Sequence, residues 1–276
     1  GCDSIFGGSG SDFLNGVAGN DAVYGGYGID TLYGGTGFDS LNGGAGADFL
    51  YGEIGDDTVN GGDGNDTLYG GTGSDSLNGG DGSDVLYGNE GDSRLDGGAG
   101  NDLIYGHDDQ DTIITGDVGD GADTAYAGNG WDSVTADSED MVDGGDGVDT
   151  LDLLRADDVT LENGLDNFEF INASGLNSAS IGSTENNNYT VSVDVQNSIT
   201  LNFATGHDRY TLRGETVTLN DTGGHNIADI TFSNQSDVIL GDGSDDVAIT
   251  SSEDTGIATI NLGHGLNNAD VNDTLV

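Results

Sequence analysis

Apolar residues recur every nine positions along the first 114 residues of the chain. Each lies two residues after an aspartate, and the repeated unit reads Gly-Gly-x-Gly-x-Asp-x-U-x, in which U is apolar. Because side chains alternate across a strand, this pattern predicts a three-residue strand Asp-x-U whose U side chain faces a core, joined by a six-residue glycine-rich turn. The U positions are Ile5, Leu14, Val23, Leu32, Leu41, Leu50, Val59, Leu68, Leu77, Leu86, Leu95, Ile104 and Ile113.

The aspartates of the unit keep the same spacing, and Ser93 is the one interruption. Ca²⁺ prefers six to eight oxygen ligands, which carboxylates and the carbonyls of glycine loops can supply, so we predict calcium sites at these residues. A three-residue insertion near 115–117 precedes the last three, which are irregularly spaced. The candidate ligands are Asp3, Asp12, Asp21, Asp30, Asp39, Asp48, Asp57, Asp66, Asp75, Asp84, Asp102, Asp111, Asp123, Asp132 and Asp149.

This repeat resembles that of the RTX family, the calcium-binding nonapeptide-repeat proteins that Gram-negative bacteria and cyanobacteria secrete. The resemblance implies an all-β fold, a right-handed parallel β-roll in which two nonapeptides form one turn and Ca²⁺ lies between stacked glycine loops. It also implies type I export, with an uncleaved C-terminal signal, to the outside of the cell or its surface.

With eighteen residues in a turn, each ion should lie between an aspartate and its counterpart eighteen residues later. Asp12 would pair with Asp30 along one edge and Asp3 with Asp21 along the other, giving roughly ten sites. The two sites beside Ser93, toward Asp75 and toward Asp111, should be weak or empty.

An eighteen-residue period also appears in the sequence itself, because the residues one and three after each aspartate alternate between two kinds. Both positions point outward if U points inward, so one outer sheet should carry tyrosines with apolar neighbours and the other mostly Ser, Thr and Asn. The apolar face could stabilise only its own sheet, be covered by another copy or by the C-terminal part of the chain, or bind carbohydrate. Its candidate interface residues are Phe13, Tyr33, Phe49, Tyr51, Tyr69, Val85, Tyr87, Leu103 and Tyr105.

The domain organisation follows from where this pattern weakens. Regular repeats occupy 1–114 and irregular ones 115–152, and from 153 to 276 glycine is less frequent and alternating β segments appear at 189–195, 198–203 and 227–232. We expect the last region to continue the solenoid with longer turns and few or no calcium sites, and a separate β-sandwich is the alternative.

Charge and composition make a bound cation necessary. Four arginines and no lysine stand against 51 acids, for a net charge of −47, and such a chain ordinarily stays disordered unless cations relieve its self-repulsion. The lack of basic residues excludes nucleic-acid binding through phosphates, and no apolar run is long enough for a transmembrane segment. A single cysteine, Cys2, cannot form an internal disulfide, which leaves metal as the candidate staple.

No catalytic motif accompanies the repeats, and the four histidines His107, His207, His225 and His264 are scattered, so we predict that the chain is not an enzyme. Two functions fit: an extracellular structural or adhesive module that folds on Ca²⁺ and assembles into a surface layer or filament, or the C-terminal folding and type I secretion module of a larger RTX enzyme or toxin. The chain starts at Gly1 and both ends stop inside a repeat, from which we expect a piece of a longer protein, with head-to-tail stacking of copies as the alternative.

Overall fold

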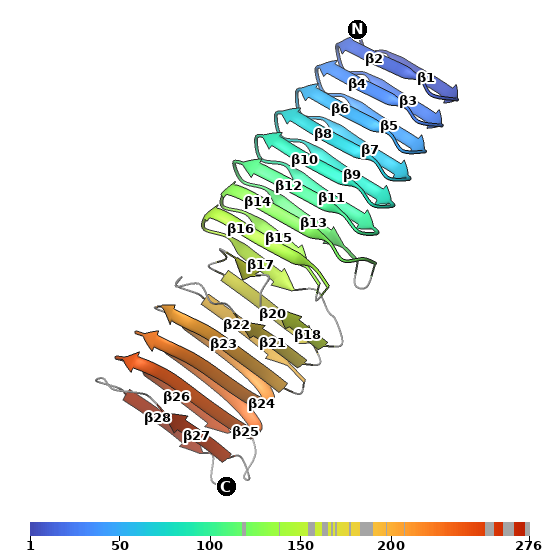
Figure 1. Cartoon of the computed structure of the whole chain (residues 1–276). Helices are drawn as coiled ribbons and strands as arrows, with labels where there is room; N and C mark the ends of the chain where they lie inside the picture. The colour runs from blue at the N-terminus through green and yellow to red at the C-terminus, as the bar shows by residue number, and fades with distance from the viewer. Residues whose placement is uncertain are drawn as a thin grey trace. The chain divides into compact units, whose positions relative to one another are not determined.

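The computed structural model describes residues 1–117, 120–137, 139–153, 158–161, 165–166, 168, 170–176, 178–182, 190–196, 198–206, 208–251, 257–261 and 268–273. The chain divides into two compact units, Gly1–Asp149 and Thr150–Val276. In both units the described strands pair in parallel, and the described residues contain no helix. The fold is therefore an all-β parallel solenoid, as the sequence predicts (Figure 1).

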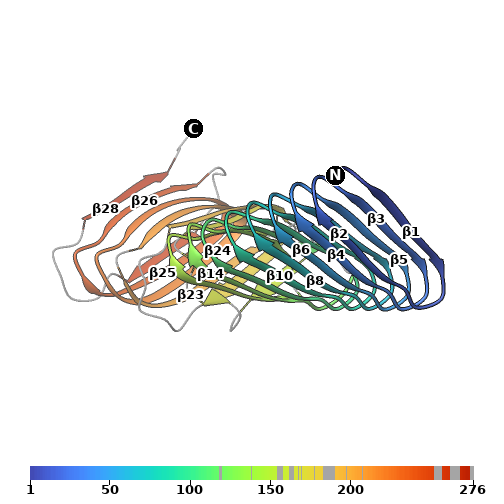
Figure 2. The ribbon, with the colours of Figure 1, turned by 90° about the horizontal axis from the view of Figure 1, so that it is seen from above.

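The first unit is a coil whose strands alternate between two walls. Seen from above, its successive coils lie one behind another (Figure 2). The odd-numbered wall, sheet A, contains β1 (Ser4–Ser9), β3 (Ala22–Tyr27), β5 (Ser40–Ala45), β7 (Thr58–Asp63), β9 (Ser76–Asp81), β11 (Arg94–Ala99), β13 (Thr112–Gly116) and β15 (Ser133–Ala136). The even-numbered wall, sheet B, contains β2 (Phe13–Ala18), β4 (Thr31–Thr36), β6 (Phe49–Ile54), β8 (Thr67–Thr72), β10 (Val85–Glu90), β12 (Leu103–Asp108), β14 (Thr124–Gly130) and β16 (Met141–Gly147).

Strand register confirms that two nonapeptides form one turn. Phe13 lies opposite Thr31 and Ser4 opposite Ala22, eighteen residues apart in each wall. The insertion lengthens one coil to 21 residues, since Leu103 pairs with Thr124, and the next coil has 17, since Thr124 pairs with Met141. The irregular spacing of the later repeats therefore changes the length of a coil without breaking the stack.

The U residues form the core that the sequence predicts. From Val23 to Ile113 each is at most 1% exposed, so one column of aliphatic side chains fills each wall's inner face. The predicted lengths of strand and turn, however, are wrong. Each regular strand has six residues and includes the two positions of the glycine pair, because a glycine such as Gly8, with φ of 104°, still pairs with Gly26 of the next coil. Only the three residues Gly-x-Asp turn the corner.

The second unit is a less regular parallel solenoid. Its strands are β17 (Thr150–Leu153), β18 (Asp158–Leu161), β19 (Leu165–Asp166), β20 (Phe170–Leu176), β21 (Ser178–Gly182), β22 (Thr190–Val195), β23 (Ser198–Gly206), β24 (Arg209–Gly224), β25 (Ile227–Gly243), β26 (Asp246–Ser251), β27 (Ile257–Asn261) and β28 (Asn268–Asp273). Paired residues lie 18 to 22 positions apart, as Arg209 with Ile227 and Asp246 with Asn268 show. This parallel stacking is a continued solenoid with longer turns, and a sandwich is not formed.

The β segments predicted after residue 153 are confirmed by β22, β23 and β25. In β24 and β25 one continuous strand takes the place of two, since β24 pairs with β22 through its first half and with β23 through its second. Residue 189 of the first of these segments, His207, His264 and the terminal residues 274–276 lie outside the described residues.

Candidate metal centre

Two columns of aspartates run along the edges of the first unit, where each strand is joined to the next. In both columns the backbone N–H of one aspartate donates to Oδ1 of the aspartate one coil later, over 2.7 to 2.8 Å in the regular repeats. One column contains Asp12, Asp30, Asp48, Asp66, Asp84, Asp102, Asp123 and Asp140. The other contains Asp3, Asp21, Asp39, Asp57, Asp75, Ser93, Asp111, Asp132 and Asp149.

The structure therefore pairs the predicted ligands as the spacing requires, and most of these carboxylates hold their second oxygen inside the edge. That atom is buried and has no hydrogen-bond partner. A buried carboxylate oxygen without a partner is costly, so its repetition along both edges indicates a ligand that the oxygens are built to meet. This holds for Oδ2 of Asp12, Asp21, Asp30, Asp39, Asp48, Asp57, Asp66, Asp75, Asp84, Asp102, Asp111, Asp123 and Asp132.

Glycine gives these oxygens their space. A Cβ placed on Gly34 would lie 2.7 Å from Oδ2 of Asp39 and 2.8 Å from the carbonyl oxygen of Gly52 in the next coil. Both distances are too short for a side chain, which explains the first glycine of the unit. The pocket so formed is lined by carboxylate and carbonyl oxygens, the hard donors that Ca²⁺ prefers.

The pKa values of the column aspartates also indicate a cation site. Burial raises the pKa of Asp66 and Asp84 to about 6, and that of Asp102 and Asp123 to about 7, and neighbouring carboxylates add to the effect although backbone N–H donors oppose it. The ionised column is thus unfavourable by itself, and a divalent cation would remove the repulsion.

Ser93 stands in the column without a carboxylate, and the weak or empty calcium sites predicted on either side of it remain a prediction. It keeps the hydrogen bond from the N–H of Asp75, but over 3.3 Å, and it brings no carboxylate. A Cβ on Gly88 would still meet the carbonyl oxygen of Gly106 at 2.8 Å, whereas its nearest contact on Ser93 is Cβ at 3.5 Å. The arrangement around Gly88 therefore keeps its carbonyl oxygen and lacks one carboxylate ligand.

Side chains alone do not complete a site. Within the described part of the chain, no group of three or more His, Cys, Asp or Glu side chains is placed to hold a metal ion. Each pocket combines carboxylates with backbone carbonyls instead, a donor set suited to a hard cation and not to a transition metal.

Comparison with protein families agrees with this geometry. The model of the RTX calcium-binding nonapeptide repeat matches residues 1–23, 24–59, 51–86, 60–95, 87–118 and 115–140, about half of the chain. The chain belongs to the RTX family. No curated protein matches it, and within the described residues no helix has the length and apolar character needed to cross a membrane.

One member of the RTX column was missed by sequence reasoning. Asp140 is 7% exposed, and its Oδ1 accepts the N–H of Asp123 while Oδ2 accepts the Thr115 hydroxyl at 2.7 Å. It lies eight residues after Asp132 and therefore fell outside the nine-residue count. Its own signal was the Asp-x-U triplet Asp140-Met141-Val142.

A second, outer row of polar residues was also missed. The residue that precedes the RTX aspartate accepts an N–H from the next coil: Oδ1 of Asp56 from Ser74 at 2.9 Å, and Oδ1 of Asn65 from Ser83 at 3.1 Å. Asn20, Asp92 and Asn101 do the same. These five residues each link a glycine corner to the next coil, in the direction opposite to the bonds of the inner column.

The second unit repeats the inner pattern in a short form. The N–H of Asp208 donates to Oδ1 of Asn226 at 3.1 Å, and the N–H of Asn226 donates to Oδ1 of Asp245 at 3.0 Å. The sequence carries fragments of the RTX repeat at 206–208 and at 241–245. Their aspartates, Asp208 and Asp245, are therefore parts of one column, and Asn226, which lies in no fragment of the repeat, joins them.

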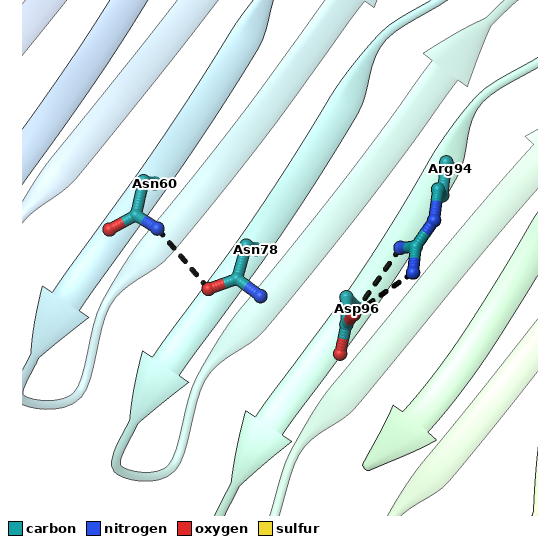
Figure 3. Close-up of polar contacts among 4 residues, drawn as sticks. All are labelled: Asn60, Asn78, Arg94 and Asp96. Carbon is teal, nitrogen blue, oxygen red and sulfur yellow. Dashed lines mark hydrogen bonds and ion pairs between the residues drawn. The ribbon is translucent and has the colours of Figure 1, made fainter.

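The outer walls of the RTX unit differ as predicted. On sheet A, Asn42, Asn60 and Asn78 form an amide ladder with 3.2 Å hydrogen bonds, and Arg94 pairs with Asp96 at 3.2 Å (Figure 3). On sheet B the rings of Tyr33, Tyr51, Tyr69, Tyr87, Tyr105 and Tyr126 stack at 4.7 to 5.2 Å. The tyrosines cover one another's ring faces, which leaves the ring edges outward and little ring face for a sugar to stack on.

Proposed function

We propose that this chain is a calcium-binding structural or adhesive repeat protein that works outside the cell. The single observation that carries the proposal is the buried carboxylate oxygen, without a partner, that recurs on both edges of the first unit. The candidate ligands are the RTX aspartates of the two columns, completed by carbonyl oxygens of the glycine corners. About ten ions would occupy these edges and would offset roughly twenty of the negative charges, at two charges for each ion.

Folding and calcium binding would be one event. The carboxylate columns repel one another when ionised, and their pockets exist only when successive coils are stacked, so binding free energy becomes folding free energy. The chain would stay expanded where Ca²⁺ is scarce, as in a cytoplasm, and would fold after export. Folding that waits for external calcium is what we expect of a protein that acts outside the cell.

The walls support a structural role. Each carries in-register ladders of identical side chains, amides on sheet A and tyrosines on sheet B, which stiffen a stacked solenoid and offer long, regular surfaces for assembly into a layer or filament. The alternative role is the folding and type I secretion module of a larger RTX enzyme or toxin, for which the same calcium response is expected without assembly.

The test is a calcium titration of the full chain, followed by far-UV circular dichroism and by size in solution. We expect a cooperative change from an expanded coil to β structure, with growth into larger species once the chain is folded. A folded chain that stays monomeric would favour the secretion module over the scaffold. No response to millimolar Ca²⁺ would overturn the calcium proposal, and titration with Mg²⁺ is the matched control because its octahedral preference does not suit these pockets.

A further inference from the structure

The outer surface of sheet B, here called the tyrosine face, is built from three side-chain rows on β2 to β16. The central row holds the stacked tyrosines, and Phe13, Phe49 and Met141 in a flanking row are 71%, 42% and 52% exposed. The rows are Phe13, Thr31, Phe49, Thr67, Val85, Leu103, Thr124 and Met141; Asn15, Tyr33, Tyr51, Tyr69, Tyr87, Tyr105, Tyr126 and Asp143; and Val17, Gly35, Glu53, Gly71, Asn89, His107, Gly128 and Gly145.

Charge distinguishes this face from the rest of the molecule. Glu53 and Asp143 are the only acids in its three rows, although the chain carries 51. An apolar, aromatic surface with two acids, on a protein of net charge −47, lets another macromolecule approach with less repulsion than an acidic surface would, although Glu90, Asp108 and Asp146 follow one residue beyond its third row. Tyrosine is also the residue that interfaces favour, and ring stacking has already fixed these side chains, so little conformational entropy remains to be lost.

The size of the face is that of an interface. Eight strands about 4.8 Å apart and five residues in width give, with the side chains' own breadth, an area of roughly 40 Å by 20 Å. This is about 800 Å², which is what one partner contributes to a stable complex.

The spacing of side chains along the face indicates which partner fits it. Side chains recur about every 4.8 Å over eight strands, and only a surface with the same period can interdigitate with them along the whole length. A second copy of this chain supplies that period by construction.

The three rows also read nearly the same from both ends, about a midpoint between β8 and β10. A two-fold axis along the strands at that midpoint would bring β2 opposite β16, β4 opposite β14, β6 opposite β12 and β8 opposite β10 of the second copy. In the central row each of the six tyrosines then faces a tyrosine, and Asn15 faces Asp143. In one flanking row Phe13 faces Met141, Phe49 faces Leu103, Thr31 faces Thr124 and Thr67 faces Val85.

The third row places a carboxylate opposite a side chain that can donate a hydrogen bond to it. In this row β6 contributes Glu53, which is exposed, and the position that the same axis places opposite it, on β12, is the exposed His107. His107 lies against the rings of Tyr87 and Tyr105, at centroid distances of 6.1 and 5.9 Å. Both acids of the face thus avoid an acidic counterpart, since Asp143 meets Asn15.

We propose that the tyrosine face binds the same face of a second copy, with the two solenoids antiparallel, Tyr69 opposite Tyr87 of the second copy and Glu53 opposite its His107. The contact is isologous and closes as a dimer. This inference rests on the proposed function, because the face exists only in the calcium-folded chain, and it specifies one contact of the proposed assembly.

Sedimentation of the full chain in saturating Ca²⁺ tests the contact. We expect a dimer, and Tyr69→Asp should weaken dimerisation at least tenfold, since it places a carboxylate in the low-charge centre of the face. Asn60→Asp, a matched change in the corresponding row of sheet A, should leave dimerisation unchanged. Circular dichroism in calcium distinguishes failure of the dimer proposal from failure of the proposed function. A β-folded monomer would overturn the dimer but not calcium-dependent folding, whereas an unfolded chain would overturn the proposed function itself. Equal effects of the two substitutions would also overturn the tyrosine contact.

Cross-linking tests the register. In a Cys2→Ser background, Thr31→Cys chains mixed with Thr124→Cys chains should cross-link through a short thiol reagent. Neither variant alone should do so, because the same residue in the two copies of the dimer is separated by five strand spacings, about 24 Å. Cross-links within the Thr31→Cys sample alone would show a different arrangement of the two copies and overturn the proposed axis.

Discussion

The backbone N–H of Asp48 donates a 2.7 Å hydrogen bond to Oδ1 of Asp66, one coil further along the solenoid, and leaves Oδ2 of Asp66 buried without a partner. One carboxylate thus does two things: it holds the preceding corner in place and offers a free oxygen to the pocket beside it. The stack and the candidate metal sites are therefore built from the same atoms, which is why calcium binding and folding are expected to occur together.

Removing such a carboxylate should cost more in the middle of a column than at its end. We predict that Asp48→Ala or Asp66→Ala raises the calcium midpoint of folding more than Asp149→Ala does, because each of the first two serves a stacked pair of pockets whereas Asp149 is the last member of its column. In all three variants a buried backbone N–H loses its acceptor, at about 1 to 3 kcal/mol, so this cost does not distinguish them. Calcium titrations followed by circular dichroism give the midpoints. Equal shifts for the three variants would contradict regular stacking.

Restoring the missing carboxylate should strengthen binding. Ser93 occupies a column position whose neighbours, Asp75 and Asp111, are both aspartates, so Ser93→Asp needs no change of backbone. We expect a lower calcium midpoint and at least one more bound ion per chain, measured by calorimetry and by metal analysis of the folded protein. Ser93→Asn restores an amide acceptor without charge, and a gain of the same size from that variant would show that hydrogen bonding, not a calcium ligand, was missing.

The fold and most of this site could be predicted because a fixed period determines the register. Once Asp and U recur every nine residues and the outer rows alternate every eighteen, the pairs Asp12–Asp30 and Leu32–Leu50 follow without any measurement. Strand length could not be predicted in the same way. Positive φ at Gly8 suggests a turn, yet residues of this conformation continue the parallel ladder from coil to coil, and the pair of Asn89 with His107 does so without glycine.

The residues that were missed depend on coil length, which the repeat does not encode. Asp140 joins its column because one coil has 17 residues, and Asn226 joins a column of the second unit through neighbours 18 and 19 residues away. Asp56 and Asn65 hold the corners through contacts that exist only after the coils are stacked. Such contacts between coils are visible in the structure and have no signature in a nine-residue unit.

The glycine pockets allow a matched test of the ligand geometry. Gly34→Ala and Gly88→Ala both place a Cβ 2.8 Å from a carbonyl oxygen of the next coil, but only the first also approaches a carboxylate, Asp39 Oδ2, at 2.7 Å. We expect Gly34→Ala to raise the calcium midpoint several-fold more than Gly88→Ala, since both strain the stack and only Gly34→Ala displaces a strong ligand. Calcium-binding isotherms of the two variants measure the difference. If the two shifts are the same, strain accounts for both and the pocket beside Asp39 is not a metal site.

A buried cluster in the second unit should make stability depend on pH. Tyr210 donates to Oδ2 of Asp221 at 2.7 Å and contacts Oδ2 of Asp208 at 3.3 Å, and all three side chains are at most 2% exposed. Burial, with the neighbouring Asp208 adding to it, raises the pKa of Asp221 to about 7 from an ordinary value of 3.8, while the donors from Tyr210 and Gly223 oppose the rise.

The direction of the change in stability with pH follows from the difference in proton binding between the folded and unfolded states. Because the folded state binds the proton of Asp221 more tightly than the unfolded state does, the stability gained from the protonated carboxyl is complete below pH 3.8 and is lost as the pH rises through 7. The loss is at most about 4 kcal/mol for a difference of about three pKa units.

Asp221→Asn should remove this dependence, so its melting temperature in saturating Ca²⁺ should fall less than that of the parent chain between pH 5 and pH 8. Asp229→Asn, at an exposed position of β25, is the control for lost charge. Calcium binding itself weakens in acid in all three proteins, so the measured quantity is the difference between their slopes. Parallel slopes for the parent chain and Asp221→Asn would show that Asp221 is already ionised in the folded protein.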